Sequence, residues 1–283
     1  MDKKTKIEKL LEKYGVNDQR TDGWHIKRGE LLTASEIYKA LANATESQKY
    51  ELMISKIIPT IPKEGNTPRP LIWGTRFEPI AKEVYTAENE GVKIVDTSCV
   101  NHPTVSFLGA SPDGIIITED VNDSRYGCLV EFKCPISRIF NDSTPIPPQY
   151  YHQMQLQMEC TELNECDYIE MKFLDLNYSD WFTNQSKYKG WFAVHIDDVT
   201  VKYHLLNDTR DMVTWKQEEC VNNDDWTMVY WVLEIKRSCK VLHETDWLEK
   251  NLPSIQSVWN EILKHREAGT VPEHPKEKTI LTL

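Results

Sequence analysis

The stretch "GASPDGIIITEDVNDSRYGCLVEFKCPIS", residues 109–137, decides the fold of this chain. Two runs rich in apolar β-formers, "GIIIT" and "CLVEF", flank the turn-rich segment "NDSRYG", and this pattern is typical of a β-hairpin. Alternation along the second strand puts Glu131 and Lys133 on one face and Val130, Phe132 and Cys134 on the other. Asp113 stands where the first strand begins, so we expect pairing of the strands to bring it beside Glu131.

Three charges on neighbouring strands have two interpretations. An isolated Glu-x-Lys is most often a solvated surface pair, worth about 0–1 kcal/mol. With Asp113 added, two carboxylates and a lysine suit Mg²⁺, which binds hard oxygen ligands and commonly uses one or two protein carboxylates. Lys133 would then orient a water and offset charge that builds on a phosphate. Glu78 would complete the shell from a helix, although a lone glutamate there more often complements the helix dipole.

Working outward from the hairpin, the spacing of apolar residues predicts further elements. The order is a charged amphipathic N-terminal helix, two more helices, three strands in a meander, a helix and a strand. Aromatic-rich strands and a closing helix follow. The expected ranges are helices over 33–56, 71–90, 150–163 and 245–269, and strands over 91–97, 104–118, 128–134, 166–176, 190–196, 199–206 and 226–238.

Length and composition set bounds on the class of protein. A chain of 283 residues is long for one domain and short for two, so we expect a single domain with decorations. No apolar run is long enough for a membrane span or an export signal. Seven cysteines without a C-x-x-C pair fit reduced thiols, so we expect an intracellular protein that is not secreted. The net charge of -11 argues weakly against general nucleic-acid binding but leaves a local basic lining open.

Five motifs in order give the chain a resemblance to a known family. They are "WHIKRGELLTAS", "WGTRFEPIA", "GASPDGI", "VEFKCP" and "YYHQMQLQM", and together they span residues 24 to about 175. The chain resembles the phage λ exonuclease and YqaJ-like viral recombinase family of PD-(D/E)XK nucleases. D…E-x-K alone would be weak evidence, whereas five ordered motifs are strong.

The resemblance implies a fold and a domain layout. The expected fold class is α/β, with a restriction-endonuclease-like core in which a central mixed β-sheet is flanked by helices. Residues 1–283 would form a single nuclease domain, with the catalytic core at about 20–180. The strands and helix of 181–283 would be a family-specific extension.

The resemblance also implies a role for each matched residue. Asp113 and Glu131 would bind the metal, helped by the backbone carbonyl of Phe132, and Lys133 would be the catalytic lysine. Two further catalytic residues would be Glu78, beside the metal, and Gln153, in contact with Lys133 or with the attacking water. Gln155 also matches the motif, but residues two apart on a helix point in different directions, so only one of them can face the site. We favour Gln153. The family's 5′-phosphate site would be formed by Arg28 and Ser35.

The activity implied is a Mg²⁺-dependent 5′→3′ exonuclease on linear double-stranded DNA, with Mn²⁺ able to substitute, in viral or phage-type recombination or repair. No cysteine precedes Cys99, so we expect none of the iron–sulfur clusters that related nucleases hold with one cysteine ahead of the nuclease motifs. The implied partners are DNA ends, a single-strand annealing protein and two further copies in a homotrimer. Two alternatives remain: a structure- or sequence-selective endonuclease, and a DNA-end-binding scaffold without catalysis.

Overall fold

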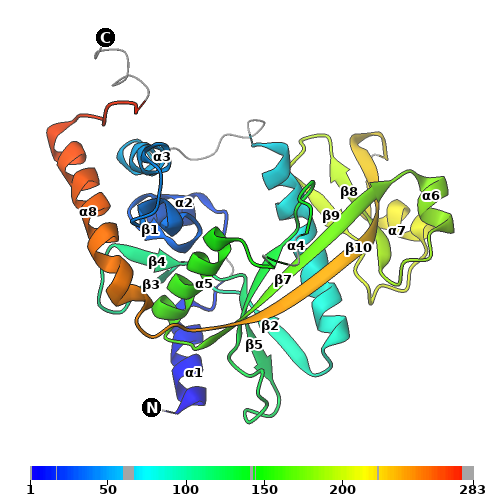
Figure 1. Ribbon diagram of the computed structural model, residues 1–283. Helices are drawn as coiled ribbons and strands as arrows, with labels where there is room; N and C mark the ends of the chain where they lie inside the picture. Colours follow the sequence, from blue (N-terminus) through cyan, green and yellow to red (C-terminus); the bar gives the residue numbers. More distant parts are fainter. Residues whose placement is uncertain are drawn as a thin grey trace.

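The computed structural model describes residues 2–16, 18–59, 67–140, 143, 145–221 and 223–275. Within these residues the chain forms a mixed α/β fold (Figure 1), which confirms the expected fold class. The helices are α1 (Lys3–Tyr14), α2 (Asp22–Gly29), η1 (Ala34–Ala40), α3 (Glu46–Ile57), α4 (Arg69–Glu88), α5 (Pro148–Thr161), α6 (Tyr178–Thr183), α7 (Met212–Glu219), η2 (Asn223–Asp225) and α8 (Trp247–Ala268). The strands are β1 (Leu32–Thr33), β2 (Val92–Val95), β3 (Val100–Asn101), β4 (Leu108–Ala110), β5 (Gly114–Thr118), β6 (Leu129–Lys133), β7 (Glu165–Leu176), β8 (Lys189–His195), β9 (Val201–Tyr203) and β10 (Trp226–Leu242).

The main sheet has seven strands in the order β2-β5-β6-β7-β10-β8-β9. Only the β6–β7 pair is parallel, and α5 makes the crossover between these two strands. The other pairs in this sheet are antiparallel. A second, small sheet has the order β1-β4-β3. The strand β10, which comes late in the chain, lies between β7 and β8, so the last third of the sequence is part of the central sheet.

Side chains alternate along the strands of the main sheet, so apolar residues point to both of its faces. Helices cover both faces. On one face, Phe77 and other apolar residues of α4 pack with Val130 and Ile169. On the other, α5 brings Met154 into a core that includes Leu129 and its strand neighbours. The hairpin face that carries Glu131 is therefore the face beneath α5.

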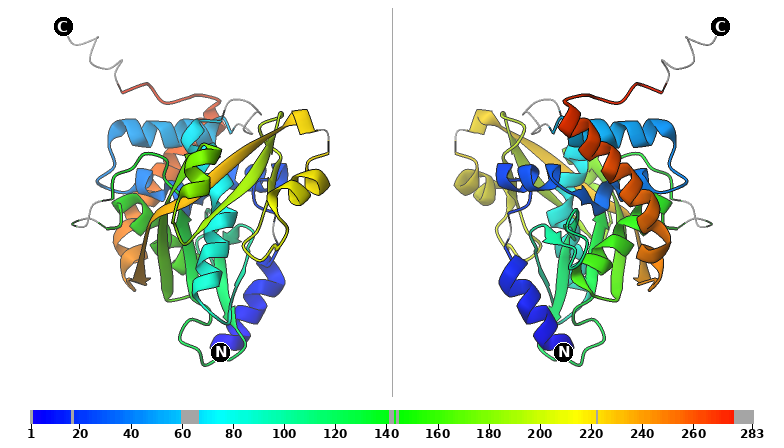
Figure 2. Two further views of the ribbon diagram at one scale, coloured as in Figure 1. Left: turned by 90° about the vertical axis from the view of Figure 1, so that its right-hand side faces the viewer. Right: turned by 90° about the vertical axis from the view of Figure 1, so that its left-hand side faces the viewer.

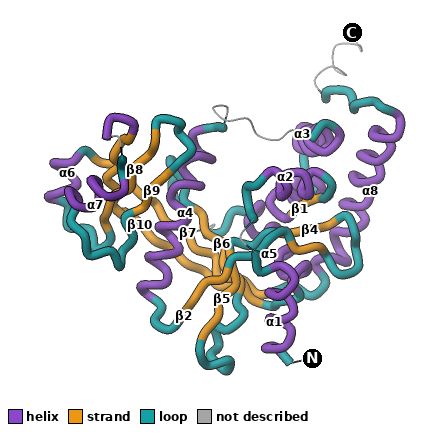
Figure 3. Tube along the Cα trace, turned by 180° about the vertical axis from the view of Figure 1, so that it is seen from behind, coloured by secondary structure: helices purple, strands orange, loops and turns teal. Residues whose placement is uncertain are grey.

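The remaining helices extend the fold at two ends (Figures 1 and 3). At one end α8 runs beside α3 and packs on η1 through a third apolar core (Figure 2). At the other end a lobe surrounds the N-terminal half of β10, and it consists of β8, β9, α6 and α7. No helix in the described part of the chain combines the length and apolar character that a bilayer crossing requires.

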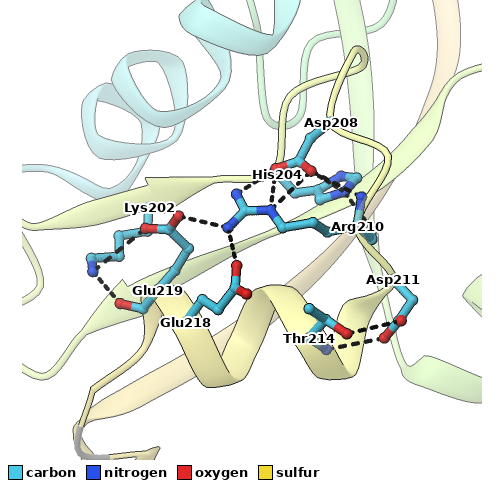
Figure 4. A network of polar contacts seen from close by, with 8 residues as sticks. All are labelled: Lys202, His204, Asp208, Arg210, Asp211, Thr214, Glu218 and Glu219. Carbon is cyan, nitrogen blue, oxygen red and sulfur yellow. Dashed lines mark hydrogen bonds and ion pairs between the residues drawn. The ribbon is translucent and has the colours of Figure 1, made fainter.

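A network of charges ties the loop after β9 to α7 in this lobe (Figure 4). Arg210 donates to Asp208 at 2.6 Å, to Glu218 at 2.8 Å and to Glu219 at 3.0 Å. Asp211 caps α7 by accepting from its backbone N–H groups. One guanidinium thus joins three carboxylates from the loop and the helix, a structural role that needs no ligand.

Two expected elements are each divided into two in the structure. The single helix expected over 33–56 is two helices, η1 and α3, because Leu41 is extended and Thr45 starts a new helix. The Thr45 hydroxyl accepts from the Gln48 N–H at 3.2 Å while the Gln48 side chain accepts from the Thr45 N–H at 2.9 Å, which is a capping box. The strand expected over 104–118 is also divided. Pro112, which has no N–H for a ladder, lies between β4 and β5, and these strands join different sheets.

Candidate active site

The β5–β6 hairpin brings Asp113 and Glu131 together. Gly114 pairs with Val130, so the next residue pair outward is Asp113 and Glu131. The backbone N–H of Phe132 donates to Asp113 Oδ2 at 2.6 Å, which fixes the carboxylate against the neighbouring strand. The convergence expected from the alternation of the two strands is therefore present.

Glu131 has no exposed surface, so the interpretation of these charges as a solvated pair is wrong. Its Oε1 atom accepts from Lys133 Nζ and, at 2.6 Å, from Gln153 Nε2. Its Oε2 atom accepts from Gln157 Nε2, also at 2.6 Å. A buried carboxylate is tolerated only when it is paired and hydrogen-bonded, and here both oxygens have donors.

Helix α5 supplies both amides because its period places them on the same face. Gln153 and Gln157 are four residues apart and lie on one face, whereas Gln155 donates to the Leu242 carbonyl at 2.9 Å and accepts from the Glu244 N–H at 2.9 Å. Gln153 therefore faces the site and Gln155 does not. The contact of Gln153 is with Glu131 rather than with Lys133. Gln157 was missed from sequence, although its i+4 spacing from Gln153 was the available signal.

Lys133 lies between the two carboxylates and an aromatic ring. Its Nζ atom is 4.6 Å from the centre of the Tyr150 ring. Burial acts to lower the pKa of Lys133, but the charges of Glu131 and Asp113 outweigh it and raise the pKa. The raised pKa favours the charged form of Lys133 in this arrangement, so the lysine compensates the charge of the neighbouring carboxylates.

Glu78 reaches the same group of charges from α4. Its carboxylate pairs with Arg20 and, at 3.1 Å, with Lys82, which also pairs with Asp96 at 2.8 Å. Burial acts to raise the pKa of Glu78, but Lys82 and Arg20 together hold it below its usual value. Glu78 thus faces the site as a charged group with two cationic partners, while its field acts on Asp113.

The donor set fits a hard divalent cation. Burial first, and then the charges of Glu131 and Glu78, raise the pKa of Asp113 well above its usual value. Like charges held together in this way favour a cation between them. Asp113 Oδ2 and the Glu131 carboxylate are oxygen ligands of the kind that Mg²⁺ binds. Among the described residues no cluster of three or more His, Cys, Asp or Glu side chains forms a ready-made metal site.

Arg28 and Ser35 contact each other, as their expected shared role requires. Arg28 donates to Ser35 Oγ at 2.8 Å, and its guanidinium lies 4.3 Å from the centre of the Trp24 ring. The Trp24 indole N–H donates to Ser111 Oγ at 3.1 Å, two residues before Asp113. Arg28 and Ser35 are therefore linked through the Trp24 side chain to the segment between β4 and β5, which contains Asp113.

Further charged residues near the site were not found from sequence. Glu170 on β7 stands in register with Lys133 and is almost fully buried. Its carboxylate pairs with Arg138 at 2.9 Å. Arg20 belongs to the same group because it binds Glu78. These contacts join segments distant in sequence, so no local pattern marks them.

Comparisons with known proteins support the resemblance. Residues 23–164 match the model of the YqaJ-like viral recombinase domain. The chain is 22% identical over 309 aligned positions to the uncharacterized protein R354 of Acanthamoeba polyphaga mimivirus, covering 91% of this chain and 55% of that protein. The chain thus spans about half the length of the curated relative it matches.

Solved structures show the same fold. The crystal structure of an alkaline exonuclease (LHK-Exo) from Laribacter hongkongensis superposes with a TM-score of 0.53 at 19% identity, covering 93% of this chain and 100% of that one. A crystal structure of LHK-Exo in complex with dAMP superposes with a TM-score of 0.52 at 20% identity, covering 88% and 95% of the two chains.

Proposed function

This chain belongs to the YqaJ-like viral recombinase family, and from that premise we propose that it is a metal-dependent deoxyribonuclease of DNA recombination. In its finer form the proposal is a Mg²⁺-dependent 5′→3′ exonuclease on linear double-stranded DNA, with Mn²⁺ able to substitute. The observation that carries it is the convergence of Asp113, a fully buried Glu131 and Lys133 on one hairpin. Membership of the family and the fold shared with alkaline exonucleases support a nuclease.

Each residue of the site has a distinct task in this proposal. Asp113, Glu131 and the Phe132 carbonyl would hold the metal, which when bound polarises the phosphodiester and lowers the pKa of its water. Protonated Lys133 stabilises negative charge that develops on the phosphate. Gln153, with Gln157, keeps the Glu131 carboxylate in one orientation. Glu78 would complete the metal's ligand shell from α4.

Polarity would come from Arg28 and Ser35. A guanidinium fork and a hydroxyl bind a terminal phosphate well, and Trp24 holds this pair at a set position relative to the strand of Asp113. A 5′ phosphate seated there would place the first linkage near the metal ligands.

The annealing protein, the homotrimer and a role in repair belong to the same proposal. The division into a catalytic core at about 20–180 and an extension over 181–283 belongs to it as well.

The test is a time course on duplex DNA labelled at one end. Linear duplex should shorten from its 5′ ends in Mg²⁺ or Mn²⁺ and stay intact in Ca²⁺ or chelator, because Ca²⁺ accepts looser coordination that misaligns the attacking water. Covalently closed circles should survive. Glu131→Gln should abolish cleavage, while Glu165→Gln, which changes a carboxylate at the start of β7, should not.

Three results would contradict the proposal in different ways. Rapid linearisation of supercoiled circles would favour an endonuclease. Binding of DNA ends without cleavage in any of these metals would favour a scaffold. Loss of label from 3′ ends would reverse the polarity while leaving the nuclease assignment in place.

A further inference from the structure

A short segment between α1 and α2 reaches the candidate active site from outside the residues that match the family. Gln19 Nε2 donates to the Thr97 carbonyl at 2.8 Å and to the Pro112 carbonyl at 3.1 Å. Pro112 directly precedes Asp113. The segment is therefore fastened to the link between β4 and β5, next to the proposed metal ligand Asp113, and the residue after Gln19, Arg20, is held at the edge of the site.

The backbone of Arg20 adopts a conformation that side chains disfavour. Its φ angle is 71°, in the left-handed region that Cβ crowding makes rare for residues other than glycine. Conformations of this kind persist where surrounding contacts enforce them, and they concentrate at functional sites. Here Gln19 supplies such contacts on one side, and the ion pair of Arg20 with Glu78 supplies one on the other.

Arg20 is the most available of the cations described around Glu78. Lys82 lies between two carboxylates, Glu78 and Asp96. Arg76 donates to the side chain of Asp198 at 2.6 Å and to its carbonyl at 2.8 Å. The side chain of Arg20 is 47% exposed and is paired with Glu78 alone among the described residues. Its guanidinium therefore has donors that face solvent at the mouth of the site.

The pairing of Arg20 with Glu78 is also exchangeable. If the guanidinium leaves, Glu78 keeps Lys82 at 3.1 Å, so no carboxylate is left without a cation. The planar guanidinium presents five N–H donors in a geometry that matches two phosphate oxygens at once. A phosphodiester that approaches the site can thus replace Glu78 as its partner.

We propose that Arg20 is a DNA-phosphate-binding residue, which exchanges Glu78 for a backbone phosphate of the strand that enters the site. The ligand is a phosphodiester of duplex DNA, and the inference rests on the proposed nuclease function because it assigns a contact at that same site. It adds a residue from ahead of the matched domain to the substrate-binding surface.

The experiment measures binding of full-length protein to a 5′-phosphorylated duplex by fluorescence anisotropy, in Ca²⁺, from 50 to 200 mM salt. Arg20→Gly should weaken binding by roughly ten- to a hundredfold. Loss of one phosphate contact should also reduce the slope of log affinity against log salt by about one. Because glycine accepts the left-handed backbone, the free energy of unfolding should stay equal or rise. Arg125→Ala, which removes a partly exposed guanidinium paired with Asp123 in the turn between β5 and β6, is the matched control and should change neither quantity.

The same Arg20 substitution in Glu78→Gln protein separates phosphate binding from a purely structural role. In Glu78→Gln protein the ion pair is already lost, so a structural Arg20 would have nothing further to lose. We expect Arg20→Gly to weaken DNA binding there as well. An unchanged affinity and salt slope in both backgrounds, with wild type binding normally, would overturn this inference and leave the proposed function standing. Failure of wild type to bind duplex DNA at all would overturn both.

Discussion

Glu131 illustrates at the scale of one residue how the site is built. A carboxylate without exposed surface is stable only while its partners stay in place, and removal of one partner of a buried ion pair typically costs about 3–5 kcal/mol. Lys133 and two glutamines are those partners. The charge of Asp113 is disfavoured instead, by burial and by the nearby carboxylates. The two carboxylates should therefore respond differently to substitution around them.

Asp113→Asn should abolish cleavage without loss of stability. The asparagine oxygen can still accept from the Phe132 N–H, while the crowded negative charge is gone. In chelator its free energy of unfolding should equal or exceed that of wild type. Lys133→Ala should also abolish cleavage but lower the melting temperature, because it leaves Glu131 buried without its cation.

Thermal unfolding with and without Mg²⁺ checks this pair of variants. Mg²⁺ should raise the melting temperature of wild type by mass action and leave that of Asp113→Asn unchanged. Asp180→Asn on α6, far along the chain from the site, is the control and should retain both activity and the Mg²⁺ response. Near-normal cleavage by Asp113→Asn would remove it from the metal site.

At this scale the sequence predicted the residues whose positions follow from local periodicity. Strand alternation and hairpin pairing placed Glu131, Lys133 and Asp113 together, and helical period indicated that only one of Gln153 and Gln155 can face the site. Sequence could not reveal the contact of Arg20 with Glu78, 58 residues away. Such a contact depends on how separate elements pack, and that information is not in any local pattern.

At the scale of elements, the hairpin depends on close contact between strands at Gly114. A Cβ atom there would lie 2.3 Å from Ile94 Cγ2 and 3.2 Å from the Val95 carbonyl oxygen on β2. Gly114→Ala should therefore force β2 and β5 apart and destabilise the protein by about 1–3 kcal/mol. Cleavage should fall as well, because the displaced residue is the neighbour of Asp113.

Denaturant unfolding measures this effect, and α4 offers a matched control. A Cβ atom at Gly74 would meet nothing within 4 Å. Gly74→Ala should therefore stabilise the helix by roughly 0.5–1 kcal/mol. Equal stability of Gly114→Ala and wild type would show that β2 can move without cost.

Element boundaries were less predictable than element types. The helical pattern over 33–56 hid a break, although the sequence "TESQ" from Thr45 to Gln48 carried a readable capping box. The strand pattern over 104–118 could not reveal that its two halves join different sheets, because β4 pairs with β1 and β3, which are too short to stand out. Apolar periodicity reports burial, and several arrangements of the chain satisfy it.

At the scale of the whole molecule, the proposed polarity would depend on the relation between two proposed sites on different elements. Arg28 lies in the last turn of α2. The α8 residue Arg266 donates to the adjacent Gly29 carbonyl at 2.9 Å and to the Lys56 carbonyl of α3. Lys56 in turn donates to the Arg28 carbonyl at 2.8 Å. The position of Arg28 is thus fixed by helices from both ends of the chain.

Wild type should digest 5′-phosphorylated duplex faster than 5′-hydroxyl duplex, and Arg28→Ala should erase the difference. A charge-assisted contact of about 1.5–3 kcal/mol corresponds to initiation that is slower by roughly one to two orders of magnitude. Slow metal-dependent cleavage should remain, because Asp113 and Glu131 are unchanged. Initial rates on the two kinds of end provide the measurement. Equal wild-type rates would show that these residues bind something other than a terminal phosphate.

The position of β10 in the main sheet also governs how the chain assembles during synthesis. Residues 165–176 of β7 emerge from the ribosome well before their partner in β10, which ends at Leu242. During that interval β7 is the open edge of a partial sheet, and unpaired edges readily join other chains. β8 and β9 likewise cannot join the main sheet until β10 has been synthesised, since β10 lies between them and the rest of the sheet. Nascent chains stalled between about residues 176 and 226 should therefore be the forms most dependent on chaperones, and a premature stop in that interval would yield an aggregating fragment rather than a smaller enzyme.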